Sequence, residues 1–245
     1  MIVRMKRSNA GNPVPRRLLL PNNIVLTSWG SVDLKVFNKS RVLFPASFMI
    51  ETREKVLYID PLEIEDSKPA DYIFITHAHL DHLSLPDIEK LSKNETLIIG
   101  PQKVVKKLSG YNTRTVKPGE VLNLEDINCE TVPAHNIRPI FLWIYPHPEK
   151  DMNVGYILTI DGVRIYHAGD TDAIPEIERI RNISVALVPL GRENGKLTMN
   201  TERAAKLINT IRPEIAIPMH YEMGKNFVEK FKLLVDKEIK VEIMD

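Results

Sequence analysis

One short stretch constrains this chain more than any other: the motif Thr-His-Ala-His-Leu-Asp-His at residues 76–82. It follows an apolar run at residues 72–75 that predicts a buried strand. Where a strand opens into a loop, His77 and His79 leave the backbone on the same side and can close on one ion. Asp81 and His82 come from the following turn and point at a neighbouring position, where a second ion could sit. We therefore expect this motif to bind metal.

The ligand types narrow the choice of metal. Imidazole together with carboxylate suits zinc, manganese or iron, whereas calcium prefers oxygen ligands alone. We expect two divalent ions as cofactors, with zinc first and manganese or iron as alternatives. The competing interpretation is a solvated, histidine-rich turn, but three histidines and an aspartate at the exit of a strand favour a metal site.

Composition limits the class of protein and its partners. The chain has 245 residues, of which 43% are hydrophobic, enough for a sizeable core. The net charge of +1 gives no bulk field that would favour nucleic acid or an anionic membrane. Cys129 is the only cysteine, so there is no disulfide framework, and a reducing cytoplasm fits. No apolar run approaches the roughly twenty residues that span a bilayer. We expect a soluble cytoplasmic protein, with nucleic acid an unlikely partner and an anionic small molecule as substrate; a homo-oligomer stays open.

Two segments are expected. Residues 1–22 predict a basic, poorly structured N-terminal arm, because Gly11, Pro13 and Pro15 interrupt several arginines and lysines. Residues 23–245 predict a single domain. Strands are expected at residues 24–27, 32–37, 42–50, 56–59, 72–75, 96–99, 127–132, 156–160, 163–166, 185–188, 215–217 and 239–243. Helices are expected from Ser84, from Pro101, over residues 174–180, from Asn200 or Thr201 until Arg212, and over residues 227–235.

In both halves of the chain, strands end in possible ligands. His135 follows the strand at 127–132, His167 and Asp170 follow the strand at 163–166, and His220 follows the strand at 215–217. Strands alternate with helices throughout, which implies an α/β fold of two sheets covered by helices, with the site along one rim.

These motifs, in this order, resemble those of the metallo-β-lactamase superfamily, from about residue 23 to the end of the chain. A narrower likeness to the branch of ascorbate-6-phosphate lactonase, N-acyl phosphatidylethanolamine phospholipase D and uncharacterised metal-dependent hydrolases is carried by short motifs. These are Ile-Asp-Pro at 59–61, His-Ala-Gly-Asp-Thr at 167–171, Thr-Met at 198–199 and Pro-Met-His-Tyr at 218–221. The resemblance implies an αββα sandwich of two mixed sheets with helices on the outer faces.

The resemblance also implies a two-metal site. His77, His79 and His135 would hold one ion, Asp81, His82 and His220 the other, and Asp170 would bridge them. Such a site activates a bridging hydroxide that attacks a phosphodiester, or an ester or lactone bond. Relatives in this branch can carry tyrosine at the position of His135, so a role for His135 in the core or behind the ligands stays open, as does His147 as a replacement ligand.

Further residues have two interpretations each. Asp60 could fix the tautomer of a ligand imidazole or be a turn aspartate. The catalytic candidates are Asp81, Asp170, His147 and His167. His147 could instead be an exposed loop histidine, and His167 could instead pack behind the site. Arg192 and Lys196 could clamp an anion, and Tyr221 could donate to an oxyanion or simply pack.

Three rival functions remain. A nuclease of the same superfamily would need an inserted domain between Asp170 and His220, or a protruding arm, and this chain shows neither. A redox di-iron protein would favour glutamate where His79 stands. A binding protein with a relic site is disfavoured because a ligand stands at every position.

Overall fold

A mixed β-sheet forms the centre of each of the two units into which the computed structural model divides, Met1–Thr115 with Met244–Asp245 and Val116–Ile243. The structure describes residues 3–8, 15–36, 39–191 and 197–245. Both sheets contain parallel and antiparallel pairs, as the sequence predicts. Among the described residues, no helix is long and apolar enough to cross a membrane.

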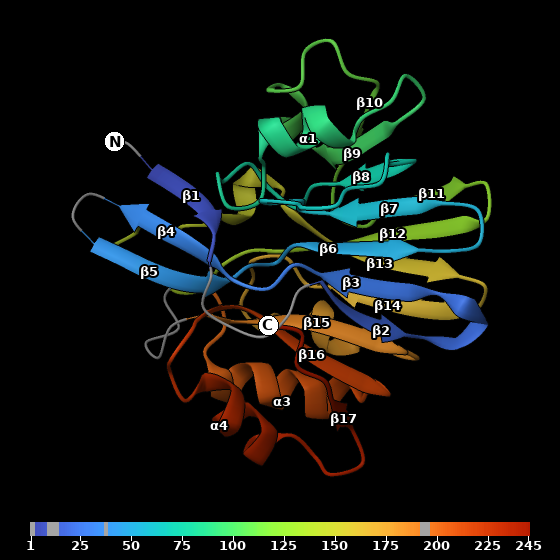
Figure 1. The fold of residues 1–245 in the computed structure, drawn as a ribbon. Coiled ribbons are helices and arrows are strands. Elements are labelled where there is room, and N and C mark those ends of the chain that lie inside the picture. Colours follow the sequence, from blue (N-terminus) through green and yellow to red (C-terminus); the bar gives the residue numbers. More distant parts are fainter. Residues whose placement is uncertain (1–2, 9–14, 37–38, 192–196) are drawn as a thin grey trace. The chain divides into compact units, whose positions relative to one another are not determined.

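The sheet of the first unit has seven strands in the order β10-β9-β8-β7-β6-β3-β2 (Figure 1). Its parallel part is β7, β8 and β9, and all three residues of β8 are buried, as expected of a strand covered on both faces. The strands are β2 (Arg16–Leu19), β3 (Val25–Ser28), β6 (Phe48–Glu51), β7 (Val56–Ile59), β8 (Tyr72–Phe74), β9 (Leu97–Pro101) and β10 (Thr113–Val116). Three further strands of this unit, which lie outside its seven-stranded sheet, pair antiparallel in the order β1 (Val3–Arg7), β4 (Val32–Val36) and β5 (Lys39–Phe44).

Two helices belong to the first unit, α1 (Leu85–Leu91) and α2 (Gln102–Val105). Helix α1 begins where the sequence predicts, because the Ser84 side chain accepts a hydrogen bond from the backbone N–H of Asp87. Its apolar side chains Ile88 and Leu91 join a buried cluster with Ile73 and Ile98, from β8 and β9. This packing fixes the segment that leaves β8 and carries the histidine motif.

The sheet of the second unit runs in the order β16-β15-β14-β13-β12-β11, and β17 pairs with β16. Strands β11 to β14 are antiparallel, and β14 to β17 are parallel. The strands are β11 (Val121–Leu124), β12 (Ile127–Pro133), β13 (Val154–Ile160), β14 (Val163–His167), β15 (Val185–Gly191), β16 (Ile215–Glu222) and β17 (Lys240–Val241). Parallel neighbours place their carboxyl ends at one edge, so the segments after β14 and β15 and the end of β16 lie there together.

Helices α3 (Thr201–Ile211) and α4 (Phe227–Leu234) pack on each other, and α3 also packs on β15 (Figure 1). The Asn200 side chain caps α3 by accepting from the backbone N–H of Arg203. The helix ends at Ile211, and the next residue, Arg212, has a left-handed backbone and precedes Pro213. Both boundaries confirm the sequence prediction.

Three expectations are wrong. The basic arm is not poorly structured throughout, because β1 and β2 lie within residues 1–22, and the Arg7 guanidinium donates to the carbonyls of Gly30 and Leu62. Residues 42–50 are two strands, since Pro45 has no N–H for a ladder. The helix expected over residues 174–180 is only a 3-10 turn, Ile177–Arg179, and its isoleucines at every third position match the 3-10 period.

Candidate metal centre

The donor side chains of the first unit follow the ends of β7 and β8. Because these two strands are parallel neighbours, Asp60 after β7 lies beside Thr76 after β8. The backbone N–H of Asp60 donates to the carbonyl of Phe74 over 2.9 Å, and the backbone N–H of Thr76 donates to Oδ1 of Asp60 over 2.8 Å. The Asp60 carboxylate is fully buried, so it is held by hydrogen bonds rather than by water.

The same carboxylate fixes two imidazoles. The Thr76 hydroxyl donates to Oδ2 of Asp60 over 2.6 Å, so its oxygen can only accept from Nδ1 of His77, 3.0 Å away. Nδ1 of His82 lies 2.7 Å from Oδ2 of Asp60 and donates to it. Each imidazole therefore carries its proton on Nδ1, which leaves the Nε2 lone pair as the ligand atom.

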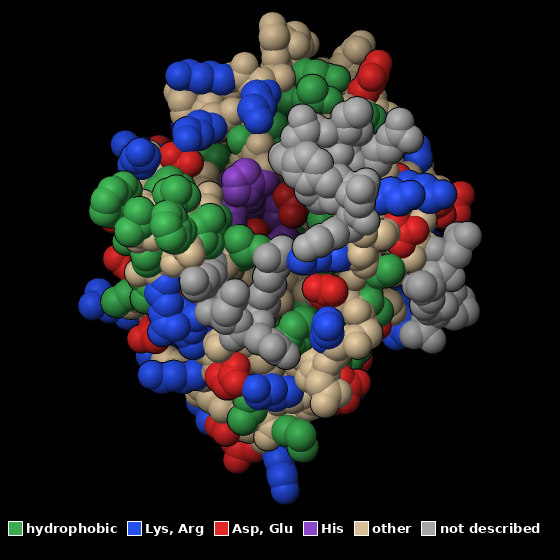
Figure 2. Space-filling view, turned by 90° about the vertical axis from the view of Figure 1, so that its left-hand side faces the viewer, with side chains coloured by type: hydrophobic (Ala, Val, Ile, Leu, Met, Phe, Trp, Pro, Cys, Tyr) green, Lys and Arg blue, Asp and Glu red, His purple; other side chains and the backbone are tan. Residues whose placement is uncertain are grey.

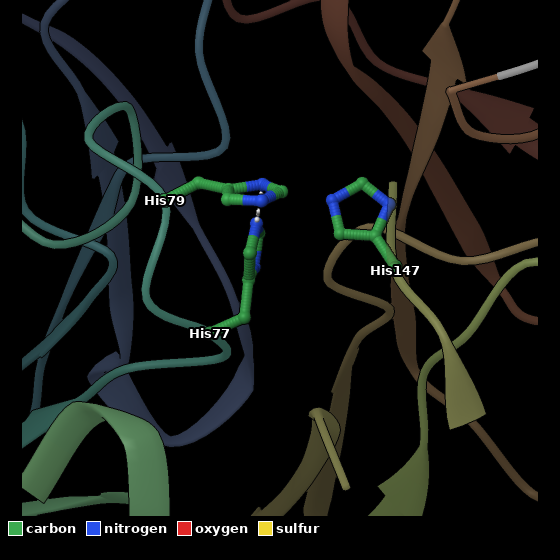
Figure 3. A group of neighbouring side chains, drawn as sticks. All are labelled: His77, His79 and His147. Atoms are coloured by element: carbon green, nitrogen blue, oxygen red, sulfur yellow. Dashed lines mark hydrogen bonds between the residues drawn. The ribbon is translucent and has the colours of Figure 1, made fainter. Parts of the chain in front are cut away.

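His77 and His79 bring ring nitrogens together (Figure 3). Nε2 of His77 lies 3.1 Å from Nδ1 of His79, and the rings are nearly perpendicular at 80°. Two imidazole ligands of a tetrahedral zinc ion, each about 2.05 Å from it, are about 3.3 Å apart. The observed distance is close to this value, so the pair fits two ligands of one ion.

Asp81 is the fourth donor of the motif. Its carboxylate is partly exposed, and its Oδ2 lies 4.0 Å from Nε2 of His82. The motif thus offers an imidazole and a carboxylate in a second pair, next to the pair of His77 and His79 along the chain.

In the second unit, Asp170 lies near two histidines. Its Oδ2 is 3.4 Å from Nε2 of His147 and 3.5 Å from Nε2 of His220. Asp170 follows β14, His147 belongs to the loop between β12 and β13, and His220 lies in β16. Asp170 and His147 are buried, and His220 is slightly exposed.

The orientation of His147, also drawn in Figure 3, is set by neighbours that only accept. Its Nδ1 lies 3.0 Å from Oδ1 of Asn136 and 3.1 Å from the carbonyl of Leu197. Oδ1 of Asn136 is identified as the oxygen because it accepts from the His147 backbone N–H, while the Asn136 amide donates to Leu197. Nδ1 of His147 therefore carries the proton, and Nε2 turns its lone pair towards Asp170. Two lone pairs facing each other at this distance fit a shared cation.

Hydrogen bonds tie the loop after β12 to the loop after β14. The backbone N–H of His135 donates to the hydroxyl of Thr171, and that of Asp172 donates to the carbonyl of His135. The buried Asp172 carboxylate accepts from the backbone N–H of Ile137 over 3.0 Å and pairs with the guanidinium of Arg203. Burial lowers the pKa of Arg203, and the Asp172 carboxylate opposes that shift.

Among the described residues, the groups able to hold a metal include every predicted ligand except His135, and they include His147. His135 is half-buried, and it lines a cavity with Trp143 and Tyr145. His167 is fully buried, and its Nδ1 accepts from the backbone N–H of Gly169, which shapes the turn that carries Asp170.

Three further predicted residues lie outside these groups or outside the described part of the chain. Tyr221 is buried, and Arg192 and Lys196 lie outside the described residues. Sequence reasoning did not find Thr76, Asn136 or Asp172. The only signal was position, since each is adjacent to a candidate donor or two residues from one.

Comparisons with known proteins show the family to which the chain belongs. The model of the beta-lactamase superfamily domain matches residues 41–220. A UPF0173 metal-dependent hydrolase of Pyrococcus furiosus is 32% identical over 81% of this chain and 92% of that protein. One of Archaeoglobus fulgidus is 33% identical over 72% of this chain and 80% of that protein. Among solved structures, a protein of Parabacteroides distasonis, proposed to be a metal-dependent hydrolase, is 29% identical with a TM-score of 0.75, over 94% of this chain and 98% of that one.

Proposed function

Because the chain belongs to the beta-lactamase superfamily, among the UPF0173 metal-dependent hydrolases, we propose that it hydrolyses a phosphodiester, or an ester or lactone bond, with two divalent ions. The observation that carries this proposal is the position of Asp170. One oxygen of its carboxylate lies at ligand-to-ligand distance from two different imidazoles, those of His147 and His220. An aspartate in that position can bind two ions at once.

The proposed ligands are seven. The first unit supplies His77, His79, Asp81 and His82, and the second unit supplies His147, Asp170 and His220. His147 takes the place that the resemblance gave to His135, because the protonated Nδ1 of His147 leaves its Nε2 as an acceptor directed at Asp170. Imidazole and carboxylate ligands fit zinc, manganese and iron alike.

The ions, when bound, lower the pKa of a water molecule enough to make it a nucleophile near neutral pH, and they offset charge on the substrate oxygen. The residues of the chain orient the imidazole ligands. Asp60 holds the Nδ1 proton of His82 and, through Thr76, that of His77, which raises the basicity of both ligand nitrogens. Asn136 does the same for His147. A serine or cysteine nucleophile is not required.

The test is metal analysis of protein purified without added metal, followed by hydrolysis assays with each ion restored. We expect two ions per chain, and hydrolysis of bis(p-nitrophenyl) phosphate or of a p-nitrophenyl ester or lactone. Asp170→Asn should lose at least one ion and the activity. Asp161→Asn, in the turn between β13 and β14, removes the same charge outside the site and should lose neither. Full activity of Asp170→Asn, or a metal-loaded protein inactive on all these bonds, would overturn the proposal.

A further inference from the structure

A cavity of about 690 Å³ opens in the second unit, within the loop that joins β12 to β13. Its wall includes His135, Asn136, Ile137, Trp143, Tyr145 and Lys150. This volume lies within the usual range of small-molecule sites. We propose that the cavity binds an uncharged apolar group, acyl or aryl, of the substrate. This inference rests on the proposed function, and it names the part of the substrate that this loop recognises.

Without an occupant, the cavity wall exposes apolar side chains to water, which is unfavourable. Trp143 is 78% exposed, and Phe141, Leu142 and Ile144 beside it are also exposed. Figure 2 shows hydrophobic side chains gathered on one side of the molecular face that it draws. A contiguous run of exposed large apolar side chains is unusual on a monomer and marks a binding surface. A ligand that covers Trp143 and Ile137 removes apolar area from water.

The wall is built rather than loose. Phe141 and Ile144 form a bridge that closes the tip of the loop, and the backbone N–H of Ile140 donates to the carbonyl of Ile144 over 2.8 Å. At the base, the backbone N–H of Ile137 is held by the buried Asp172 carboxylate. The loop therefore presents its apolar side chains from a fixed frame.

Asn136 links the cavity wall to the Asp170 cluster. Asn136, which lines the cavity, accepts from both the backbone and the ring of His147, and His147 lies 3.4 Å from Asp170. A substrate whose apolar group fills the cavity could therefore place its scissile bond near Asp170. The charges of the wall indicate the class of ligand. Glu149 and Lys150 both line the cavity and offset each other, so a charged group of the substrate would gain little electrostatic binding energy there.

The first test reads binding without turnover. Trp143 and Trp29 are the only tryptophans, and Trp29 is buried. Octanamide, an uncharged probe with an apolar chain, should shift the tryptophan emission of the metal-loaded protein to the blue at concentrations where acetamide does not. Trp143→Phe should abolish the shift. An unchanged spectrum, or a shift that survives in Trp143→Phe, would overturn the inference.

The second test compares substrates that differ only in chain length: p-nitrophenyl octanoate with the acetate, and octyl with methyl p-nitrophenyl phosphate. We expect kcat/KM to favour the octyl member by at least about tenfold, since each buried methylene strengthens binding several-fold. Trp143→Ala should reduce this preference towards one, through a loss of kcat/KM for the octyl substrate. Leu233→Ala, an equally exposed apolar side chain on α4, should change nothing.

The outcomes separate the two proposals. No hydrolysis of any substrate, with the octanamide shift retained, would remove the proposed function and leave the binding site. Hydrolysis without a chain-length preference would remove the binding site and leave the proposed function. If Trp143→Ala instead dissociates an oligomer and leaves the preference intact, the apolar wall is a subunit contact and the inference fails.

Discussion

Nδ1 of His82 and Oδ2 of Asp60 lie 2.7 Å apart, and both side chains are fully buried. Asp60 also accepts the hydroxyl proton of Thr76, which in turn faces Nδ1 of His77. One carboxylate from the end of β7 thereby sets the proton positions of two imidazoles from the end of β8. The nitrogens that we propose as ligands are therefore already oriented, which would lower the cost of binding an ion.

Asp60→Asn tests this orientation. Asparagine has only one accepting oxygen, so its NH2 group would face either the Thr76 backbone N–H or the donors at Oδ2, the Thr76 hydroxyl and Nδ1 of His82. Metal affinity should therefore fall by about 10- to 100-fold while the fold is kept. Competition with a chromogenic chelator measures the affinity, and circular dichroism reports the fold. Asp66→Asn, at an exposed position with the same left-handed backbone, is the matched control. Equal affinities in the two variants would show that Asp60 has no such role.

His147→Ala and His135→Ala distinguish the two candidate ligands. His147 directs Nε2 at Asp170, whereas His135 lines the cavity, so we expect His147→Ala to lose an ion and His135→Ala to keep both. The measurement is the metal content of each variant after dialysis against metal-free buffer. The reverse pattern would restore His135 to the ligand set implied by the family resemblance.

Cys129 provides a prediction about pH. Burial, and secondarily the Glu130 charge, raises the pKa of its thiol to about 12. The folded protein should therefore react with Ellman's reagent at pH 8 only as fast as it unfolds, and one thiol per chain should react at once in concentrated guanidinium. Because the folded pKa exceeds the unfolded value of 9.0, the burial of the neutral thiol contributes stability that is fully present below about pH 9 and lost as pH rises towards 12. Rapid labelling of the native protein would contradict this.

Gly155 provides a prediction about packing. A Cβ at this position in β13 would lie 2.8 Å from the carbonyl oxygen of His167 and 2.9 Å from that of Ala168, both backbone atoms. Gly155→Ala should lower the free energy of unfolding by about 1–3 kcal/mol. It should also weaken metal binding, because His167 and Ala168 lead directly to Asp170. Urea denaturation measures the first effect and chelator competition the second.

The control for Gly155→Ala is Gly162→Asn. Gly162 lies in the turn before β14, where a Cβ meets nothing within 4 Å and asparagine tolerates the left-handed backbone. This variant should lose no more than about 1 kcal/mol of unfolding free energy, the low end of the cost of a left-handed backbone at a residue with a side chain. If both variants were equally stable, the close approach at Gly155 would have no energetic weight.

The fold class could be predicted from the sequence because the signals that mark helices and strands lie next to them along the chain. Ser84 before α1, Asn200 before α3 and Pro213 after it mark helix ends without any knowledge of the tertiary structure. The αββα sandwich of the metallo-β-lactamase type, expected from the order of the motifs, is confirmed by the family match and by the fold of the solved relatives.

The site was less predictable, because it depends on which neighbour each side chain meets. Residues 134–153 contain two histidines, and periodicity cannot say which one reaches Asp170. Oδ1 of Asn136 and the carbonyl of Leu197 decide the matter in the structure, and Leu197 is about fifty positions away from His147 along the chain. The ion pair between the buried Asp172 and the partly exposed Arg203 could not be predicted for the same reason.

Asp60 and His220 both have a left-handed backbone, with φ of 46° and 51°, although neither is glycine. Such a conformation costs a side-chain-bearing residue about 1–3 kcal/mol, and the surrounding strands must impose it. The protein thus holds both side chains on a strained backbone, and binding of the proposed ions would offset that cost. A relative that no longer needed the metal site could replace these two residues with glycine, and it would be more stable for the change.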